Sequence, residues 1–181
     1  LLSAGIVVVI LMTPTYLQKV HGISPADALT ANSLAIVALT LGCIFYGRLI
    51  DSLGSGPTFV LGSLLLAGAT YAFYHSLAAG MDQLIPLYML AGFAVGIVGA
   101  VPYVMVNAFP PVVRFSGLSF SYNVAYAIFG GLTPMLVTLW MKNDVLAPSH
   151  YVVSLAGLGF VLGLWLWLRQ RTRRQVTPQT A

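Results

Sequence analysis

The residues of this sequence that could do chemistry are neutral hydroxyls and amides set among apolar residues. Between residues 117 and 141, polar or small side chains recur at three- and four-residue steps: Ser119, Tyr122, Asn123, Tyr126, Gly130 and Thr133. Such spacing places them along one face of a helix. The opposite face carries Phe120, Val124, Ile128 and Leu132. The pattern favours either a helix that lines a polar cavity or one that hydrogen-bonds to its neighbours.

Other candidates are isolated polar residues in the remaining apolar stretches. We expect solute-binding side chains at Tyr16, Asn32, Tyr103, Tyr122, Asn123 and Tyr126, with Asn123 as the best single candidate. Thr13 ranks with Tyr16, although each of the isolated residues also reads as an interface tyrosine or a helix cap. The three histidines, His21, His75 and His150, fall near the ends of apolar stretches, where a histidine either senses external pH or simply lies at an interface.

Catalytic and metal chemistry are not indicated. There is one cysteine, Cys43, and no glutamate, so neither a disulfide within the chain nor a metal cluster is expected. No Gly-x-Ser-x-Gly occurs, and an intramembrane serine protease needs a serine nucleophile with a histidine base at membrane depth. We therefore expect no enzyme activity, no metal and no organic cofactor.

Composition indicates which elements must position these side chains. Apolar residues make up 59% of the 181 residues and charged residues 7%, against about 25% charged in an ordinary soluble domain. The charges are spaced so that apolar stretches of roughly 20 residues remain, the length of a helix that spans a membrane. A β-barrel would alternate apolar and polar residues. The chain is therefore predicted to be an all-α membrane protein.

Six spans are predicted, at 1–18, 28–47, 57–77, 84–107, 117–141 and 150–168. Residues 1–168 form one transmembrane domain, and 169–181 a short basic tail. Six arginines fall on one side of the predicted membrane, against Lys19 and Lys142 on the other. By the positive-inside rule the arginine side is cytoplasmic, so both termini of this segment are expected there. Because the chain begins at Leu1 inside an apolar span, we expect a fragment or one part of a split protein.

Local signals add details to these spans. Ser24-Pro25-Ala26-Asp27 reads as a capping box, Pro57 as the opening of the third span, and Asp82, Ser116 and Ser149 as N-caps of the last three. Aromatic residues fall near one predicted boundary (Tyr74, Tyr88, Trp140 and Tyr151) and near the other (Tyr46, Phe109, Trp165 and Trp167), as interfacial belts do. Glycine pairs at 92 and 96 and at 159 and 163 predict close helix packing.

A loop motif points to a family. The segment from Gly47 to Gly54, with Arg48 and Asp51 inside it, resembles the Gly-x-x-x-Asp-(Arg/Lys)-x-Gly signature of the major facilitator superfamily. The resemblance implies a conformational latch between two halves of a transporter, to which Gly47, Arg48, Asp51, Gly54 and Arg114 would contribute. Here Ser52, Ser55 and Gly56 stand where basic residues are usual in that family, which weakens the charged part of such a latch.

A second stretch is more specific. The residues Arg114 to Pro134, ending in Phe-Gly-Gly-Leu-Thr-Pro, resemble the metabolite:proton symporter branch, and the proline/betaine group within it is the nearest in wording. The resemblance implies the C-terminal six-helix half of a twelve-helix fold, built as a 3+3 inverted repeat and completed by a missing N-terminal half. Weak internal symmetry agrees, since Thr13-Pro14 in the first span and Val101-Pro102 in the fourth stand in corresponding positions.

The resemblance also implies a function. It implies a multi-pass transporter of the bacterial cytoplasmic membrane that moves a small zwitterion, proline- or betaine-like, with protons by alternating access. The partners would be the solute, lipid and the missing half, with no nucleic acid. A carrier of α-ketoglutarate, citrate or shikimate is the alternative, and a channel a distant one, because neither a ring of charge nor a filter sequence is present. No ionisable group lies centrally in a predicted span, so the proton-carrying acid is expected in the missing half.

Overall fold

The computed structural model describes the backbone of residues 2–80 and 83–176, and side chains within 4–80 and 83–169. These residues form helices that are grouped here as six spans, each long and apolar enough to cross a membrane. Span one comprises α1 (Leu2–Ile6), the π-helical stretch η1 (Val7–Met12) and α2 (Thr13–His21). Span two is α3 (Pro25–Leu53) and span three is α4 (Ser55–Ala78).

Of the three remaining spans, two are also interrupted by a stretch that is not α-helical. Span four comprises α5 (Leu84–Val95), the 3₁₀ stretch η2 (Gly96–Ala100) and α6 (Val101–Ala108). Span five comprises α7 (Arg114–Ala125), the π-helical stretch η3 (Tyr126–Gly130) and α8 (Gly131–Trp140). Span six is α9 (Ala147–Val176), whose apolar part is Ala147–Arg169. The predicted number and order of spans are confirmed.

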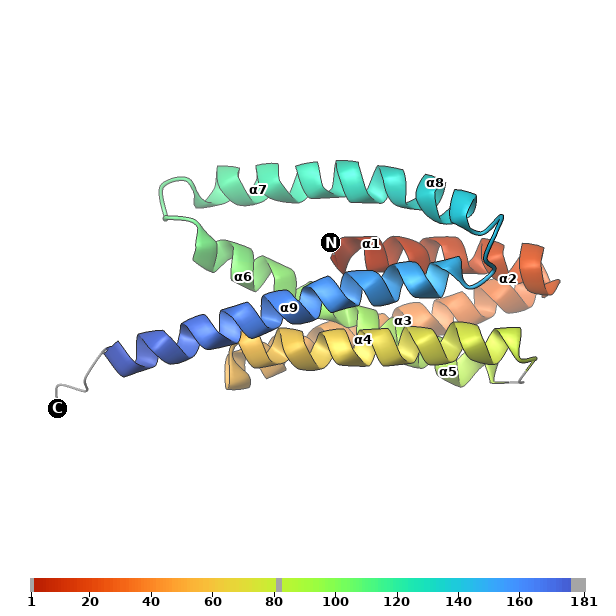
Figure 1. Ribbon diagram of the computed structural model, residues 1–181, viewed down its shortest axis with the longest axis horizontal. Coiled ribbons are helices and arrows are strands. Elements are labelled where there is room, and N and C mark those ends of the chain that lie inside the picture. Colours follow the sequence, from red (N-terminus) through yellow and green to blue (C-terminus); the bar gives the residue numbers. More distant parts are fainter. Residues whose placement is uncertain (1, 81–82, 177–181) are drawn as a thin grey trace.

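The spans run up and down along one long axis (Figure 1). The turns after α2 and α4 and the loop after α8 lie at one end, here called the lysine end because it carries Lys19 and Lys142. The turns after α3 and α6 and the C-terminal part of α9 lie at the other, the arginine end, which carries Arg48, Arg114 and Arg169. The lysines and these three arginines therefore separate to opposite ends of the bundle, as the sequence predicted.

Two helix pairs pack closely because glycines remove side chains from their interfaces. A Cβ on Gly92 of α5 would overlap the backbone of Ala35 in α3, and one on Gly42 would overlap the carbonyl of Phe93. A Cβ on Gly163 of α9 would come within 2.8 Å of the backbone nitrogen of Val60 in α4. The predicted packing roles of Gly92, Gly96 and Gly163 are thus confirmed, and Gly159 is buried as well. Small residues allow the close approach on which membrane helices rely for packing.

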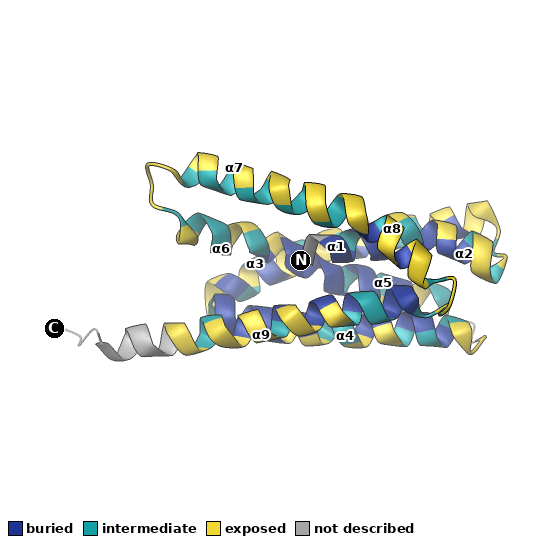
Figure 2. Cartoon of the chain, turned by 45° about the horizontal axis from the view of Figure 1, so that its top comes forward, coloured by how far each residue is buried: buried dark blue, intermediate teal, exposed yellow. Residues whose placement is uncertain are grey.

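Span five is the least enclosed part of the bundle. Its helices lie along one edge, and their outer surface is exposed over most of its length (Figure 2). Phe120, Val124, Ile128 and Leu132 are all exposed. Thr133 is fully buried, and Tyr122, Tyr126 and Gly130 are half-buried. The predicted division of this span into a polar inner face and an apolar outer face is therefore present, although Asn123 is exposed.

The helix ends follow the predicted signals only in part. Ser24 caps α3 as predicted, because its hydroxyl accepts the Asp27 N–H at 3.2 Å, with Pro25 at the first helical position. The caps predicted at Ser116 and Ser149 are wrong, since α7 begins at Arg114 and α9 at Ala147. The Asp144 carboxylate accepts the Leu146 N–H at 2.8 Å, a bond within the loop that precedes α9. The cap predicted at Asp82 lies outside the described residues.

The segment predicted as a loop between spans two and three is mostly helix. Helix α3 continues through Gly47, Arg48 and Asp51 and ends at Leu53, because the first residue that breaks it is Gly54, with φ +86°. Such a φ favours glycine over every other residue. Span two is therefore longer than predicted. Helix α9 likewise runs past the predicted boundary at residue 168, and residues 177–181 of the predicted tail lie outside the described residues.

Candidate functional site

The interruption of span one follows from its proline. Pro14 has no N–H, so one carbonyl of the preceding turn loses its helical partner. In the π-helical stretch each N–H reaches back five residues, as the bond from the Thr13 N–H to the Val8 carbonyl shows. In that register the carbonyl that Pro14 leaves free is that of Val9. The hydroxyl of Tyr88 in α5 lies 2.8 Å from this oxygen and 2.5 Å from Asn32 Oδ1, and its single proton can be donated to either acceptor.

Two hydroxyl groups bind span one to span three. The Thr13 hydroxyl donates to the Val8 carbonyl at 3.0 Å. It lies 2.7 Å from the Tyr74 hydroxyl of α4, which must then be the donor between the two. Both side chains are fully buried. A buried hydroxyl needs such a partner, since leaving it unpaired costs about 1–3 kcal/mol.

A comparable arrangement occurs in span five, also at a Thr-Pro pair. The hydroxyl of Thr133, which precedes Pro134, donates to the Phe129 carbonyl in its own span. It also lies 2.8 Å from the Tyr151 hydroxyl of α9. Spans one and five therefore share three features: a π-helical stretch, a Thr-Pro pair directly or shortly after it, and a tyrosine from a neighbouring helix that contacts the threonine.

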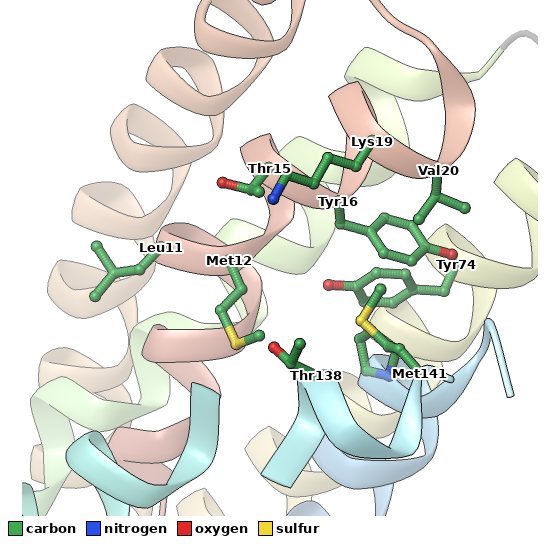
Figure 3. A pocket seen from close by; sticks show the side chains of 10 residues that line it. Leu11, Met12, Thr15, Tyr16, Lys19, Val20, Tyr74, Thr138 and Met141 are labelled. Atoms are coloured by element: carbon green, nitrogen blue, oxygen red, sulfur yellow. The ribbon is translucent and has the colours of Figure 1, made fainter. Parts of the chain in front are cut away.

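A cavity of about 220 Å³ opens at the lysine end between these two spans. Its walls come from η1, α2 and α8, with Met141 directly after α8, Tyr74 from α4 and Pro148 at the start of α9 (Figure 3). The lining residues are Leu11, Met12, Thr15, Tyr16, Lys19, Val20, Tyr74, Thr138, Met141 and Pro148. All cavity-lining residues of spans one and five come later in the chain than the midpoint of the π-helical stretch in their own span. A change of angle at either stretch would therefore change the width of the cavity.

Tyr16 connects this cavity to the loop between α8 and α9. Its ring lies 5.2 Å from that of Tyr74, edge to face. Its hydroxyl donates to the Val145 carbonyl in the loop between α8 and α9, at 3.2 Å. The loop is held further by a hydrogen bond, with His150 Nδ1 2.8 Å from Asp144 Oδ2. The contacts of Tyr16 thus join span one, span three and the loop before span six.

The structure brings together some of the predicted solute-binding residues and separates others. Tyr16 lines the cavity. Asn32 lies deeper, where its Oδ1 is 2.5 Å from the Tyr88 hydroxyl, and ring contacts from Tyr88 through Phe73 to Tyr74 connect the two regions. Tyr103 lies elsewhere, on the wall of an open groove of about 510 Å³ that also includes Trp165 and Arg169.

The three candidates in span five stand apart from this cavity. The hydroxyls of Tyr122 and Tyr126 lie 3.3 Å from each other. The Asn123 amide donates to the Ser119 carbonyl of its own helix at 2.8 Å. None of the three appears among the cavity-lining side chains in the described part of the chain. Tyr122 and Tyr126 lie on the half-buried face of α7 and η3 instead, and Asn123 is exposed.

The residues of the predicted latch gather at the arginine end without forming an ion pair. Arg114 starts α7, and its Nε donates to the Phe109 carbonyl at 3.4 Å. Arg48 and Asp51 are exposed in the last turns of α3. Over residues 4–80 and 83–169, the ion pair at 4.0 Å or less is the one between Asp144 and His150. The latch role of these residues stays a prediction.

Two tyrosines of the site were misassigned from the sequence. Tyr74 and Tyr88, predicted as interfacial aromatic residues, are fully buried inside the bundle, and so is Tyr46. Trp140 and Trp165 are exposed, as residues of an interfacial belt would be. The partners of Tyr74 and Tyr88 on span one lie 61 and 79 residues away, so no local pattern distinguishes these tyrosines from the belt residues.

Comparison with known proteins finds sequence similarity to transporters. No protein-family profile matches the chain, and no solved structure matches it. The chain is 27% identical over 164 residues, 86% of its length, to a Staphylococcus aureus (strain COL) protein that carries a provisional assignment as a proline/betaine transporter. It is 28% identical over 159 residues to the ectoine/proline transporter ProP of Corynebacterium glutamicum, and 28% identical over 140 residues to the proline/betaine transporter of Salmonella typhimurium.

These relatives are much longer than the chain. It spans 34% of the length of the Staphylococcus protein, 31% of the Corynebacterium protein and 28% of the Salmonella protein. Similarity over 72–86% of the chain means that most of its spans have counterparts in each relative. Together with the six apolar helices, this similarity identifies a multi-pass membrane protein that resembles proline/betaine transporters.

Proposed function

We propose that the chain is the C-terminal six-helix half of a secondary active transporter with the major facilitator fold. On this proposal the complete protein moves a small zwitterionic solute, proline- or betaine-like, across the cytoplasmic membrane together with protons. The observation that carries the proposal is the similarity to proteins named proline/betaine transporters over 72–86% of a chain that has six apolar spans. The arginine end would face the cytoplasm, in keeping with the positive-inside rule.

The interrupted spans support the alternating-access part of the proposal. Span one and span four are both irregular directly before a proline that stands second in the following helix, Pro14 in α2 and Pro102 in α6. Matching interruptions in spans one and four are what a 3+3 inverted repeat would produce, and transporters of that kind bind solute against interrupted helices. The cavity would then face the missing half, and the movement of the two halves would open it to either side.

Proton coupling requires an ionisable group within the membrane. In the described residues the acids occupy helix ends and a loop: Asp27 in the first turn of α3, Asp51 in its last turn and Asp144 before α9. We therefore place the proton-carrying acid in the other half of the transporter. No cofactor is needed on this proposal, since the proton itself is the coupling ion.

Uptake into proteoliposomes that contain the full-length parent tests the proposal. We expect saturable uptake of radiolabelled proline or betaine that an inward proton gradient stimulates several-fold. Uptake at the same rate with and without the proton gradient would contradict symport and indicate facilitated diffusion. If α-ketoglutarate were accumulated instead, the carboxylate-carrier alternative would replace the zwitterion. The variant Asn123→Ala in the same assay shows whether the exposed Asn123 amide of span five belongs to the transport path.

A further inference from the structure

An open groove of about 510 Å³ lies between α6 and α9, whose C-terminal parts are both at the arginine end (Figure 1). A face of α9 that α4 leaves uncovered forms one of its walls. On its other side α9 packs against α4 so closely that a Cβ on Gly56 would overlap the backbone of Trp167. The groove-lining residues of α9 recur at three- and four-residue steps, which places them on one helix face: Leu162, Trp165, Leu166 and Arg169.

The groove changes from apolar to polar towards the arginine end. Leu162 and Val104 line its deeper part, within two of the apolar spans. Arg169 comes two turns later in α9 and Asn107 about one turn later in α6, and Ser55 begins α4 at the same end. From Leu162 to Arg169 the helix rises by roughly 10 Å. An apolar wall followed by a polar end fits a phospholipid, in which acyl chains and headgroup follow in the same order.

Arg169 supplies the positive charge of the polar end. Its side chain is exposed, and its guanidinium carbon lies 5.1 Å from the ring centre of Trp165. It takes part in no ion pair within the described residues. An arginine can contact an aromatic ring and still offer its planar set of N–H donors to a phosphate, often two at once. The guanidinium is therefore available to bind a phosphodiester anion.

Asn107 adds a hydrogen-bond donor, and the groove holds no opposing acid. The Asn107 amide nitrogen carries two N–H groups, of which one donates to the Tyr103 carbonyl at 2.9 Å. None of the groove-lining side chains in the described part of the chain is a carboxylate, and Asp51 in the last turn of α3 is not among them. The charge of the groove thus favours an anion over a cation.

The aromatic rings of the groove are accessible to a ligand. Trp165 is 53% exposed and Tyr103 is 44% exposed. Tryptophan and tyrosine suit the level of the lipid headgroups, where the ring contacts apolar chains and the N–H or O–H contacts polar groups. A small soluble anion would use Arg169 and Asn107 but would leave these rings and the apolar wall without a partner.

We infer that the groove between α6 and α9 binds an anionic phospholipid, with the phosphate on Arg169 and Asn107 and an acyl chain along the apolar wall. Basic pockets between membrane helices on the cytoplasmic side bind anionic headgroups, and the arginine end faces that side in the orientation proposed above. Arg171, Arg173 and Arg174 follow in the sequence and add positive charge beyond the groove. The inference depends on the membrane location of the chain and not on the solute that the complete protein carries.

Equilibrium binding of radiolabelled phosphatidylglycerol to the full-length parent in detergent tests this site, with unlabelled phosphatidylglycerol, phosphatidylcholine and inorganic phosphate as competitors. Phosphatidylcholine has no net charge and should compete about tenfold more weakly, and Arg169→Met should weaken phosphatidylglycerol binding about tenfold, the effect of losing one charged hydrogen bond. Arg48→Met is the matched control, because Arg48 is also exposed at the arginine end but does not line the groove; it should bind the lipid normally.

A second variant tests whether the lipid occupies the groove itself. Ala108 is exposed and lines the groove, so the larger side chain of Ala108→Trp should take up space there and weaken phosphatidylglycerol binding about tenfold without lowering the melting temperature. Full affinity in Ala108→Trp would overturn the inference.

Three further outcomes would overturn it. Equal losses in Arg169→Met and Arg48→Met, or equal affinity for the two lipids, would indicate general attraction to a basic surface. Displacement by inorganic phosphate at the concentrations at which the lipid itself competes would indicate a site for soluble anions. Because lipid binding is measured without transport, a failed uptake assay leaves this inference standing, and absent lipid binding leaves the proposed transport standing.

Discussion

Gly92→Ala is expected to cost the protein about 1–3 kcal/mol of folding stability, although it adds a single methyl group. The new Cβ would overlap the backbone of Ala35, and a backbone segment inside a packed helix cannot move aside as a side chain can. Helices α3 and α5 would have to separate, and with them the contacts of Gly96 against Gly42 and Cys43. The measurement is the thermal melting of the purified protein in detergent.

Gly68→Ala provides the control for this prediction. Gly68 lies within α4, and nothing lies within 4 Å of where its Cβ would stand. Alanine is favoured over glycine in a helix by about 0.5–1 kcal/mol, so this variant should melt at the wild-type temperature or slightly above it. Equal melting temperatures for Gly92→Ala and Gly68→Ala would show that α3 and α5 are not in backbone contact.

Tyr88→Phe is expected to cost about 1–3 kcal/mol, because it leaves the Val9 carbonyl buried without a partner. It also removes the hydroxyl next to Asn32. The cost depends on Pro14, since the missing N–H of that residue is what frees the carbonyl. In a Pro14→Ala background the new N–H can reach this oxygen, so Tyr88→Phe should cost clearly less there. A double-mutant cycle on melting free energies measures the difference.

Tyr71→Phe is the reference for a tyrosine hydroxyl outside the network. Tyr71 is on α4 and its side chain is 51% exposed, so the loss of its hydroxyl should be nearly neutral. If Tyr88→Phe costs the same in both backgrounds, the hydroxyl does not compensate for the proline. If Tyr88→Phe is as mild as Tyr71→Phe, the network does not stabilise span one.

Much of the fold follows from patterns within single segments. Six apolar stretches of spanning length must become helices, because a lipid environment leaves backbone groups no other partners than those within the segment. The capping by Ser24 and the close approach at Gly92 are equally local, since each depends on residue type and spacing alone. The two faces of span five were predictable for the same reason: polar side chains at helical spacing face inward when lipid surrounds the bundle.

The helix ends were less predictable, because several residue types can satisfy the same free N–H groups. Ser116 and Ser149 have side chains suited to capping, yet α7 and α9 begin before them. The loop before α9 is instead held by Asp144, which contacts the Leu146 N–H and His150, and by the Val145 carbonyl, which accepts from Tyr16. Tyr16 and Val145 are 129 positions apart in the chain, and no local window contains both.

The sequence by itself determined that this protein is a bundle of six membrane-spanning helices, which glycines allow to pack closely, and that its inner polar groups are neutral. Only the tertiary structure decided that Tyr74 and Tyr88 are buried partners of span one and that a cavity with Lys19 at its edge lies between α2 and α8. The physical reason is the dual nature of tyrosine. The tyrosine ring is stable in lipid, at an interface or in a core. Which of these places it occupies therefore depends on where its hydroxyl finds a hydrogen-bond partner. Here those partners lie on a helix distant in sequence, where a proline has freed a carbonyl.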